Sequence, residues 1–527
     1  MNQPRRFPAG LQVFSDIIEG GYAYVDKTDL MWRMQNLSKY IFLSRPRRFG
    51  KTMLSFTLRS FFEGRRDLFE GLKVMELEKE WKSYPVLQIT LSEAKDEADE
   101  SSLVNKLKLI LSDYSGKYGR NPEETTPGGM LRGLIRRAYE QTGNQVVVLI
   151  DEYDAPLLSV LQDEKRLESY RRVLQELYTP LKASEQMLKF CFITGITKFS
   201  QLSIFSTIIN VTNISLTPDF ATICGITEQE LTTQLADGIQ KLADYQGVSS
   251  DEMHERLRQK YDGYHFAEKS EGVYNPFSVM KAFLLNKLDY YWFDSGTPSY
   301  LFHQMQHFHT DITALDNIEV PAQAFDLPTE AMTDALPLLY QSGYLTIKEF
   351  DPESEIYTLS IPNQEVRVGF TQGLLPAFVS IDAIKTQTGF ALKFWRALKK
   401  HDINLAMEEF RAYLSSLPYI TGFKDKLKDI STKEGFYEWS LYLIFSMLNI
   451  YVVTQVRCAG GRIDVVVHMP DTIYVLELKM RGTAQSALDQ INQKGYARQY
   501  STSNKNIVKM GILFSPETRN IEEWVVE

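Results

Sequence analysis

Two groups of residues, far apart in the chain, have the types and spacing that phosphate chemistry requires. The first is residues 45–52, RPRRFGKT. The second joins Asp464, in one short apolar run, to Glu477 and Lys479 in the next. The first group is suited to holding a triphosphate, and the second to holding a divalent cation beside a phosphodiester.

The first group matches the end of the phosphate-loop pattern G-x-x-x-x-G-K-[ST] through Gly50, Lys51 and Thr52. Backbone N–H groups at the start of a helix can cradle phosphate oxygens, and the lysine can reach the β- and γ-phosphates. Arg45 stands where the pattern has its first glycine. This departure indicates a loop with tighter dihedral demands, or one shaped by Pro46.

A second signal supports a nucleotide site. The apolar run at residues 145–150 (QVVVLI) ends in Asp151 and Glu152, which is the Walker B pattern. We expect Asp151 to hold Mg²⁺ together with the Thr52 hydroxyl, and Glu152 to act as general base on the attacking water. The residues expected to hold the nucleotide are Arg48, Phe49, Gly50, Lys51, Thr52 and Asp151.

In the second group, Glu477 and Lys479 lie two apart on a predicted strand and therefore point to the same face. Asp464 could face them from the adjoining strand. Two converging carboxylates suit Mg²⁺ or Mn²⁺, and Lys479 would stabilise developing negative charge or position a water. Glu434 could add a third carboxylate, and a helix over residues 484–499 could present Gln490 to the site.

The elements around the first group alternate between strands and helices. Residues 39–44, 86–91, 145–150 and 188–196 are predicted strands, and apolar residues at helical spacing predict a helix over 52–62. Strand, loop and helix in this order are the context that a phosphate loop needs. The pattern predicts an α/β sandwich over about the first 225 residues.

From about residue 227 the pattern changes. Residues 228–243 and 251–261 are predicted helices, and a hairpin is predicted between GYLTIKEF and EIYTLSI. We therefore expect domains at 1–226 (nucleotide-binding), 227–375 (helical or winged), 376–430 (helical linker) and 431–527 (nuclease-like). The strands of the last domain are predicted at 452–456, 464–468 and 473–478, after an apolar helix at 437–449.

Composition limits the remaining possibilities. The 527 residues are 44% hydrophobic and carry a net charge of −9, which favours a globular protein of several domains over a uniformly basic nucleic-acid coat. The 3 cysteines are too widely spaced for a zinc knuckle or a disulfide framework. The N-terminus has no apolar signal core, and no apolar stretch is long enough for a membrane span. We expect a cytoplasmic protein that does not enter a membrane.

The motifs together carry a resemblance. The strings RPRRFGKT, LIDEYD, ITGITKFSQLSIFS, YDGYHF, VYNPFS and YWFDSGTPSYL resemble the bacterial AAA-ATPase-like family. The section from EGFYEWSLY through GGRIDVVV, VLELK and ALDQINQKGY resembles the PD-(D/E)XK nuclease domain that accompanies that ATPase. The resemblance covers nearly the whole chain. It implies an α/β protein with an ASCE-type P-loop ATPase core, a small helical domain and a restriction-endonuclease-like domain.

Three functions are compatible with these residues. The first is an ATP-dependent, metal-dependent nuclease acting on DNA. The second is an ATP-switched protein whose nuclease fold only grips nucleic acid or a partner. The third is an interaction protein with two vestigial sites, and the intact acids and lysines argue against it. The sequence leaves open the substrate, the arginine finger and the oligomeric state, although a homo-oligomer is expected by analogy.

Overall fold

The computed structural model describes residues 6–198, 211–295, 315–328, 332–370, 396–416, 451–458, 461–469, 471–501, 505–515 and 520–527, with a few single residues between these ranges. The chain forms two compact units. The first comprises Met1–Leu301 and Glu319–Glu365, and the second Phe302–Ile318 and Val366–Glu527.

The first unit is built on a five-stranded sheet of order β2-β3-β4-β1-β5, in which every neighbouring pair is parallel. The strands are β1 (Tyr40–Ser44), β2 (Val86–Thr90), β3 (Val146–Asp151), β4 (Leu188–Gly195) and β5 (Thr212–Asn213). β1 and β3 are buried at every residue, as strands covered on both faces should be. The predicted strands at 39–44, 86–91, 145–150 and 188–196 are confirmed to within one or two residues.

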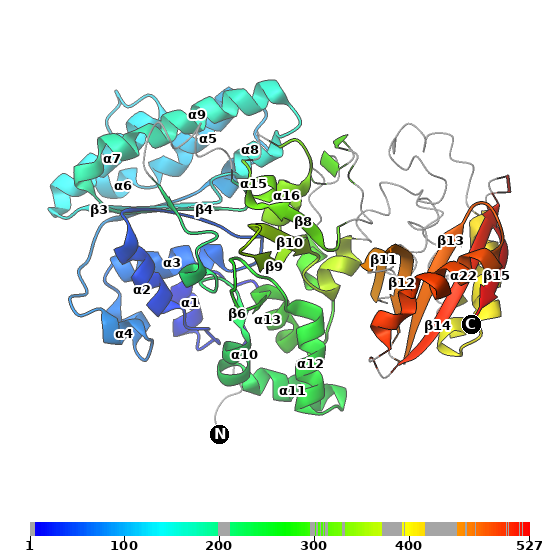
Figure 1. Ribbon diagram of the computed structural model, residues 1–527. Coiled ribbons are helices and arrows are strands. Elements are labelled where there is room, and N and C mark those ends of the chain that lie inside the picture. Colours follow the sequence, from blue (N-terminus) through cyan, green and yellow to red (C-terminus); the bar gives the residue numbers. More distant parts are fainter. Residues whose placement is uncertain are drawn as a thin grey trace. The chain divides into compact units, whose positions relative to one another are not determined.

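Helices cover both faces of this sheet (Figure 1). On one side lie α1 (Phe14–Glu19), α2 (Thr28–Leu37) and α3 (Lys51–Phe62), and on the other α5 (Glu100–Ser112), α7 (Pro127–Thr142) and α9 (Glu164–Ala183). α7 begins with Thr126 as its N-cap and ends at Gly143, which adopts a left-handed conformation. This α/β sandwich with a parallel sheet is the predicted architecture of a P-loop-like core.

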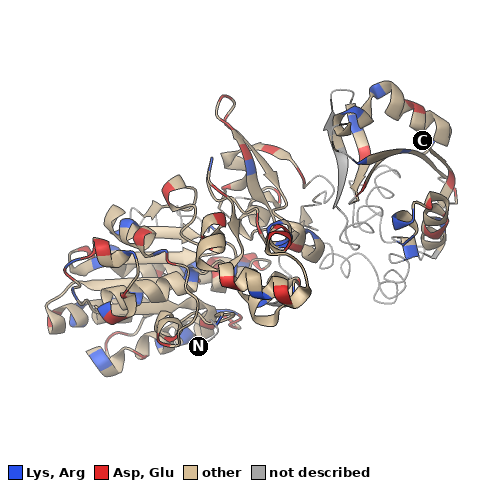
Figure 2. Cartoon of the chain, turned by 90° about the horizontal axis from the view of Figure 1, so that it is seen from below, with Lys and Arg blue, Asp and Glu red and all other residues tan. Residues whose placement is uncertain are grey.

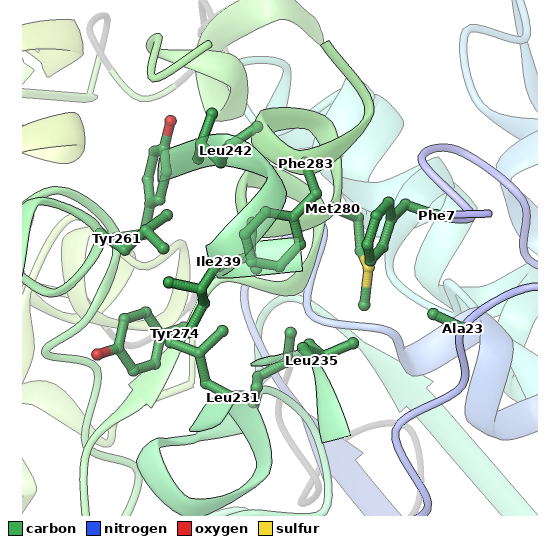
Figure 3. Close-up of a cluster of buried hydrophobic side chains, with 14 of the residues drawn as sticks. Phe7, Ala23, Leu231, Leu235, Ile239, Leu242, Tyr261, Tyr274, Met280 and Phe283 are labelled. Atoms are coloured by element: carbon green, nitrogen blue, oxygen red, sulfur yellow. The ribbon is translucent and has the colours of Figure 1, made fainter. Parts of the chain in front are cut away.

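A helical part follows within the same unit. It contains α10 (Glu228–Gln234), α11 (Ala236–Gln246), α12 (Ser250–Tyr261) and α13 (Pro276–Leu285). The sequence predicted one helix over 228–243, but the chain breaks at Leu235, and two helices result. Figure 3 shows their shared core, in which Leu231, Ile239 and Phe283 point toward one another.

Three buried residues near the start of the chain, Val25 among them, belong to that core. Phe7 and Ala23 pack into the same cluster, and the ring of Phe7 lies 5.1 Å from that of Phe283 (Figure 3). The Lys27 ammonium also contacts the Glu230 carboxylate at 2.6 Å. The helical part therefore shares its core with the N-terminal segment, and the expected boundary at 226/227 lies inside one compact unit.

The predicted hairpin in the middle of the chain is present. β9 (Thr346–Asp351) and β10 (Ile356–Ser360) pair antiparallel, and β8 (Ile318–Pro321) joins β10 in a three-stranded sheet. The short α16 (Leu336–Gln341) precedes it. A small sheet and hairpin are thus established here, whereas the winged arrangement stays a prediction.

The second unit contains a mixed sheet of order β11-β12-β13-β14-β15. Its strands are β11 (Tyr451–Cys458), β12 (Gly461–His468), β13 (Thr472–Lys479), β14 (Asn506–Ser515) and β15 (Asn520–Val526). Only β13 and β14 pair in parallel, and α22 (Ala484–Lys494) connects them and packs on the sheet (Figure 1). The predicted helix over 484–499 ends early because Gly495 adopts a left-handed conformation (φ 65°).

The structure describes some of the other features predicted for this unit and not others. α19 (Ile403–Ser416) lies in the region expected to be a helical linker. The predicted helix at 437–449 and the candidate ligand Glu434 lie outside the described residues. Within the part of the chain that the structure describes, no helix has the length and apolar character needed to cross a bilayer.

Candidate functional site

The phosphate loop connects β1 to α3 in the first unit. Two of its residues, Arg48 and Gly50, have positive φ values of 68° and 91°. Gly50 is the N-cap of α3 and adopts the left-handed conformation that glycine accepts without strain. A backbone turned in this way presents successive N–H groups at a helix N-terminus, which is a concave site for an anion.

Lys51 occupies the inside of this loop. Its side chain is buried (6% exposed), and its ammonium donates hydrogen bonds to the carbonyl oxygens of Arg45 and Pro46, both at 2.9 Å. Burial lowers the pKa of Lys51, and the charges of Asp151 and Glu152 oppose that shift. The loop thus holds a buried cation within the electrostatic reach of two acids.

Asp151 ends β3 and is fully buried. Its Oδ1 accepts the backbone N–H of Glu152 at 3.0 Å, while Oδ2 is buried without a hydrogen-bond partner among the described residues. Burial raises the pKa of Asp151 to about 6, and the nearby Thr52 hydroxyl opposes the shift. A buried carboxylate oxygen with no donor, close to a threonine hydroxyl, fits the oxygen ligands that Mg²⁺ prefers.

Glu152 follows in a conformation that is unusual for its type. Its φ of 52° lies in the left-handed region, where residues other than glycine are uncommon. Its side chain is half-buried, and therefore reachable by a water molecule. Strain of this kind is often found at functional positions, where the surrounding structure maintains it.

The contacts of Arg45 show why the loop can have an arginine where the general pattern has its first glycine. The guanidinium is buried (2% exposed) and donates to the carbonyl oxygens of Ser44 (2.9 Å), Ser215 (2.7 Å) and Phe220 (3.0 Å). It also lies over the ring of Phe266 at 4.3 Å. Burial lowers the pKa of Arg45 to about 10. The side chain leaves the loop and binds the surrounding protein, so a large residue fits where a glycine was expected.

The next two candidates use their side chains for packing. Phe49 is buried, with ring contacts to Tyr264 at 4.7 Å and Phe266 at 5.2 Å. The Arg48 guanidinium lies 4.4 Å from the ring centre of Phe277. The backbone groups of Arg48 and Phe49 remain available to a phosphate.

Sequence reasoning missed Asp154 and Trp292. Asp154 is fully buried and accepts three hydrogen bonds from Ile196 and Thr197. The Trp292 indole donates to the carbonyl of Arg47 in the phosphate loop at 3.2 Å. A second acid close behind the acidic pair was a visible signal for Asp154, whereas nothing local pointed to Trp292.

The second candidate site lies on β12 and β13. These strands pair antiparallel with Val465 opposite Leu476, so the register places Asp464 beside Glu477. Asp464 Oδ2 accepts the backbone N–H of Leu478 at 2.8 Å. The two acids therefore lie together on neighbouring strands.

Lys479 and Gln490 complete this group. Lys479 Nζ donates to Gln490 Oε1 at 2.6 Å and lies 3.5 Å from Glu477 Oε1. Gln490 Nε2 donates to the same Glu477 oxygen, and the Glu477 side chain is 4% exposed. The four predicted residues Asp464, Glu477, Lys479 and Gln490 are thus brought together by two strands and one helix.

The position of α22 depends on its ends and on one glycine. Thr483 caps its start in a capping box with Ser486. A Cβ atom on Gly511, which is paired with Glu477, would lie 2.2 Å from the Ala484 carbonyl oxygen. Only glycine lets the helix approach the sheet this closely, and that approach brings Gln490 to Glu477.

The oxygen ligands available at this second site can be compared with those that Mg²⁺ usually binds. Asp464 and Glu477 supply hard carboxylate oxygens, and Mg²⁺ often binds one or two carboxylates while water and substrate phosphate complete its shell. Among the residues that the structure describes, no group of three or more His, Cys, Asp and Glu is placed to hold an ion. The residues present therefore fit a two-carboxylate site.

Comparisons with known proteins identify the families of both domains. Residues 8–205 match a family model described as "Predicted AAA-ATPase", and residues 432–524 match the model of the PD-(D/E)XK nuclease superfamily. The uncharacterized protein in the vnfD 5' region of Azotobacter chroococcum mcd 1 is 31% identical over 535 residues, which cover 99% of each chain. The chain therefore belongs to the AAA-ATPase-like family, in the form that carries a PD-(D/E)XK nuclease superfamily domain at its C-terminus.

Proposed function

We propose that the protein binds and hydrolyses ATP with Mg²⁺ in its first unit and cleaves DNA with Mg²⁺ or Mn²⁺ in its second. The observation that carries the proposal is the group formed by the buried Lys51 and Asp151 and the half-buried Glu152 at the carboxyl edge of a parallel sheet. Ligands of open α/β sheets bind at this edge. The order of the sheet, with β4 between β1 and β3, supports the ASCE type.

Each residue of the nucleotide site has a role that its surroundings allow. Lys51 would exchange its two loop carbonyls for the β- and γ-phosphate oxygens. Thr52 and Asp151 would hold Mg²⁺, which neutralises charge on the phosphates when bound. Glu152 would orient and deprotonate the attacking water.

The nuclease site has a matching division of roles. Asp464 and Glu477 would hold the metal, which polarises the scissile phosphate when bound. Lys479 would stabilise the developing negative charge, and Gln490 would hold Lys479 in place. The exposed Arg462 and Arg481 are near the site in sequence and can contact a phosphate backbone.

Local contacts of this kind are needed because the charge of the whole chain is −9. Basic and acidic residues are interspersed along the helices of both units (Figure 2). Attraction of DNA would therefore arise from a few arginines and a bound metal, and it would weaken steeply with salt.

The ATPase is tested by phosphate release from Mg²⁺-ATP by the full chain. Lys51→Ala should lose nucleotide binding, whereas Glu152→Gln should bind ATP and lose about 10²–10⁴-fold in turnover. Glu140→Gln, an exposed acid on α7, is the matched control. A wild-type protein that releases no phosphate in the presence or absence of DNA would refute the ATPase.

The nuclease is tested on supercoiled, linear and single-stranded DNA with Mg²⁺ or Mn²⁺. Asp464→Asn should abolish cleavage, because the amide keeps an acceptor for the Leu478 N–H but removes the charge. Glu522→Gln, an exposed acid on β15, is the control and should cut like the wild type. If cleavage persists in Asp464→Asn, the assignment of this site is wrong.

One observation favours a second function, an ATP-switched binding protein with an inactive nuclease fold. Glu477 Oε1 already accepts from Gln490 and lies near Lys479, and Asp464 accepts from a backbone N–H. Carboxylate oxygens that already accept hydrogen bonds within the protein are less available to a metal. This alternative predicts that the wild type retains DNA in a gel-shift assay and cuts it with neither metal.

A further inference from the structure

The fourth residue of the sequence DEYD makes more connections around the nucleotide site than the acidic pair itself. Asp154 Oδ2 accepts hydrogen bonds from Ile196 N (3.0 Å), Thr197 N (2.7 Å) and Thr197 Oγ1 (2.7 Å). The residue is fully buried. One carboxylate oxygen therefore fixes the chain where it leaves β4.

Tyr153 strengthens the same attachment. Its backbone N–H donates to the Thr194 carbonyl at 3.1 Å, and its hydroxyl donates to the Thr197 carbonyl at 2.9 Å. The fit is tight, since a Cβ atom on Gly195 would lie 2.5 Å from Asp154 Oδ1 and 2.6 Å from the Tyr153 ring. The two residues after Glu152 thus clamp the end of β4.

The clamped segment also meets the phosphate loop. β4 pairs in parallel with β1, with Gly195 opposite Ser44, and the Arg45 N–H donates to the Gly195 carbonyl at 3.2 Å. The segment therefore lies between the loop that holds Lys51 and β3, the strand that precedes Glu152. Moving it would change the separation between the phosphates and the general base.

Asp154 also interacts electrostatically with Lys51 of the nucleotide site. Burial raises the pKa of Asp154, the hydrogen bonds from Thr197 lower it, and the charge of Lys51 lowers it further. A purely structural carboxylate could lie anywhere along β3 or β4. This one lies within electrostatic range of the lysine that would bind the phosphates.

We propose that Asp154 is a positioning residue for ATP hydrolysis, which acts by holding Thr197 and the end of β4 between the phosphate loop and Glu152. The inference rests on the proposed ATPase function and adds a residue to it. Asp154 would touch neither nucleotide nor metal. Its loss should therefore reduce the rate of hydrolysis while the affinity for ATP is kept, because misplacing a reacting group by about 1 Å can cost roughly 10²-fold.

The experiment compares kcat, KM and ATP affinity in full-length variants. Thr197→Val removes one of the three bonds to Asp154 and keeps the shape of the side chain, whereas Thr197→Ser keeps the hydroxyl. We expect kcat to fall about tenfold or more in Thr197→Val, with KM within about threefold of the wild type, and to be restored in Thr197→Ser. Asp154→Ala removes all three bonds and should show a larger loss of kcat, of about 10²-fold.

A double variant and a control separate positioning from simple stability. Asp154→Ala combined with Thr197→Val should lose little more than Asp154→Ala alone, because both changes remove the bond between Thr197 Oγ1 and Asp154 Oδ2. Thr57→Val removes another buried hydroxyl, which donates to the Met53 carbonyl at 2.8 Å, and it should lower Tm without a selective loss of kcat. If Asp154→Ala does not fold, the comparison of Thr197→Val with Thr197→Ser tests the inference by itself.

The possible outcomes distinguish a failure of the proposed ATPase function from a failure of the role proposed for Asp154. A wild type that does not hydrolyse ATP overturns the proposed function and this inference together. An active wild type with Thr197→Val at the same kcat overturns the inference alone. The inference also fails if Thr197→Ser does not restore kcat, or if kcat and affinity fall together in proportion to Tm.

Discussion

The ammonium of Lys479 donates to the side-chain oxygen of Gln490 at 2.6 Å, so a residue of α22 holds the lysine of β13. The amide nitrogen of the same glutamine donates to Glu477, the acid two residues before that lysine. Gln490 therefore fixes both the cation and the acid of the candidate nuclease site. Without it, Lys479 has Glu477 at 3.5 Å as its nearest charged group.

Gln490→Ala should accordingly reduce DNA cleavage by about 10–100-fold, which is the usual cost of losing a residue that orients a metal-site group. The fold should survive, because the side chain is only partly buried. The initial rate of plasmid nicking with Mg²⁺ measures the effect. Gln485→Ala is the matched control, since this exposed glutamine lies on the same helix and its side-chain amide donates to Asp489 Oδ1 at 2.9 Å, away from Glu477 and Lys479. Equal rates in the two variants would refute the role of Gln490.

Gly511→Ala should destabilise the second unit. The added Cβ would lie 2.2 Å from the Ala484 carbonyl oxygen and 2.6 Å from the Leu488 nitrogen. Both atoms belong to the backbone of α22, so the whole helix would have to move to relieve the clash. Overpacking of this kind costs about 1–3 kcal/mol, and the displaced helix would carry Gln490 away from Glu477. Thermal denaturation and nuclease rate should both decline. Gly116→Ala, which meets nothing within 4 Å, should leave both unchanged.

Much of the fold was predictable because its signals are local. The apolar run before Asp151 and the one before Arg45 are strands buried on both faces, and such strands are visible without knowledge of their neighbours. Glu477 and Lys479 share a face because side chains alternate along a strand. The convergence of Asp464 on them followed from one antiparallel pairing.

The parts that were missed depend on contacts between distant residues. Arg45 is explained by Ser215, Phe220 and Phe266, and no local pattern links these positions. The core of the helical part includes Phe7 from the start of the chain, and no local pattern links these two segments. The break between α10 and α11 falls at Leu235, which is neither a proline nor a glycine, so the sequence gives no sign of it.

Arg45→Gly would restore the glycine of the general phosphate-loop pattern and should nevertheless harm the protein. The carbonyl oxygens of Ser215 and Phe220 would lose a buried donor, at about 1–3 kcal/mol each, and a cavity would open beside Phe266. Urea denaturation should show a loss of at least about 3 kcal/mol. Arg45→Lys should not rescue it, because one ammonium cannot reproduce the planar fork.

The control for Arg45 is its neighbour Arg47, whose side chain is exposed. Arg47→Ala keeps the backbone carbonyl that accepts the Trp292 indole, so its stability should change by a few tenths of a kcal/mol. A stable Arg45→Gly protein with normal ATP affinity would show that the guanidinium contacts do not maintain the loop.

Glu365 should make the first unit less stable as pH rises. It is fully buried, accepts from Ser278 Oγ at 2.8 Å and from Trp292 N at 3.0 Å, and thereby connects α13 to the residue that binds the phosphate loop. Burial raises the pKa of Glu365 to about 7 from 4.5, against the opposing hydrogen bonds from Trp292 and Ser278.

Because the folded pKa exceeds the unfolded one, the native state binds the proton more tightly. This contribution to stability is complete below about pH 4.5 and is lost as pH rises through about 7, with a total on the order of 3 kcal/mol. Urea denaturation at pH 5 and pH 8 measures it as the difference between wild type and Glu365→Gln, which cancels the other titrating groups. The amide variant should lose less stability than the wild type over this range, and the exposed Glu349→Gln should follow the wild type. Parallel curves for wild type and Glu365→Gln would show that the carboxyl stays ionised in the folded protein, so that its bonds to Ser278 and Trp292 outweigh its burial.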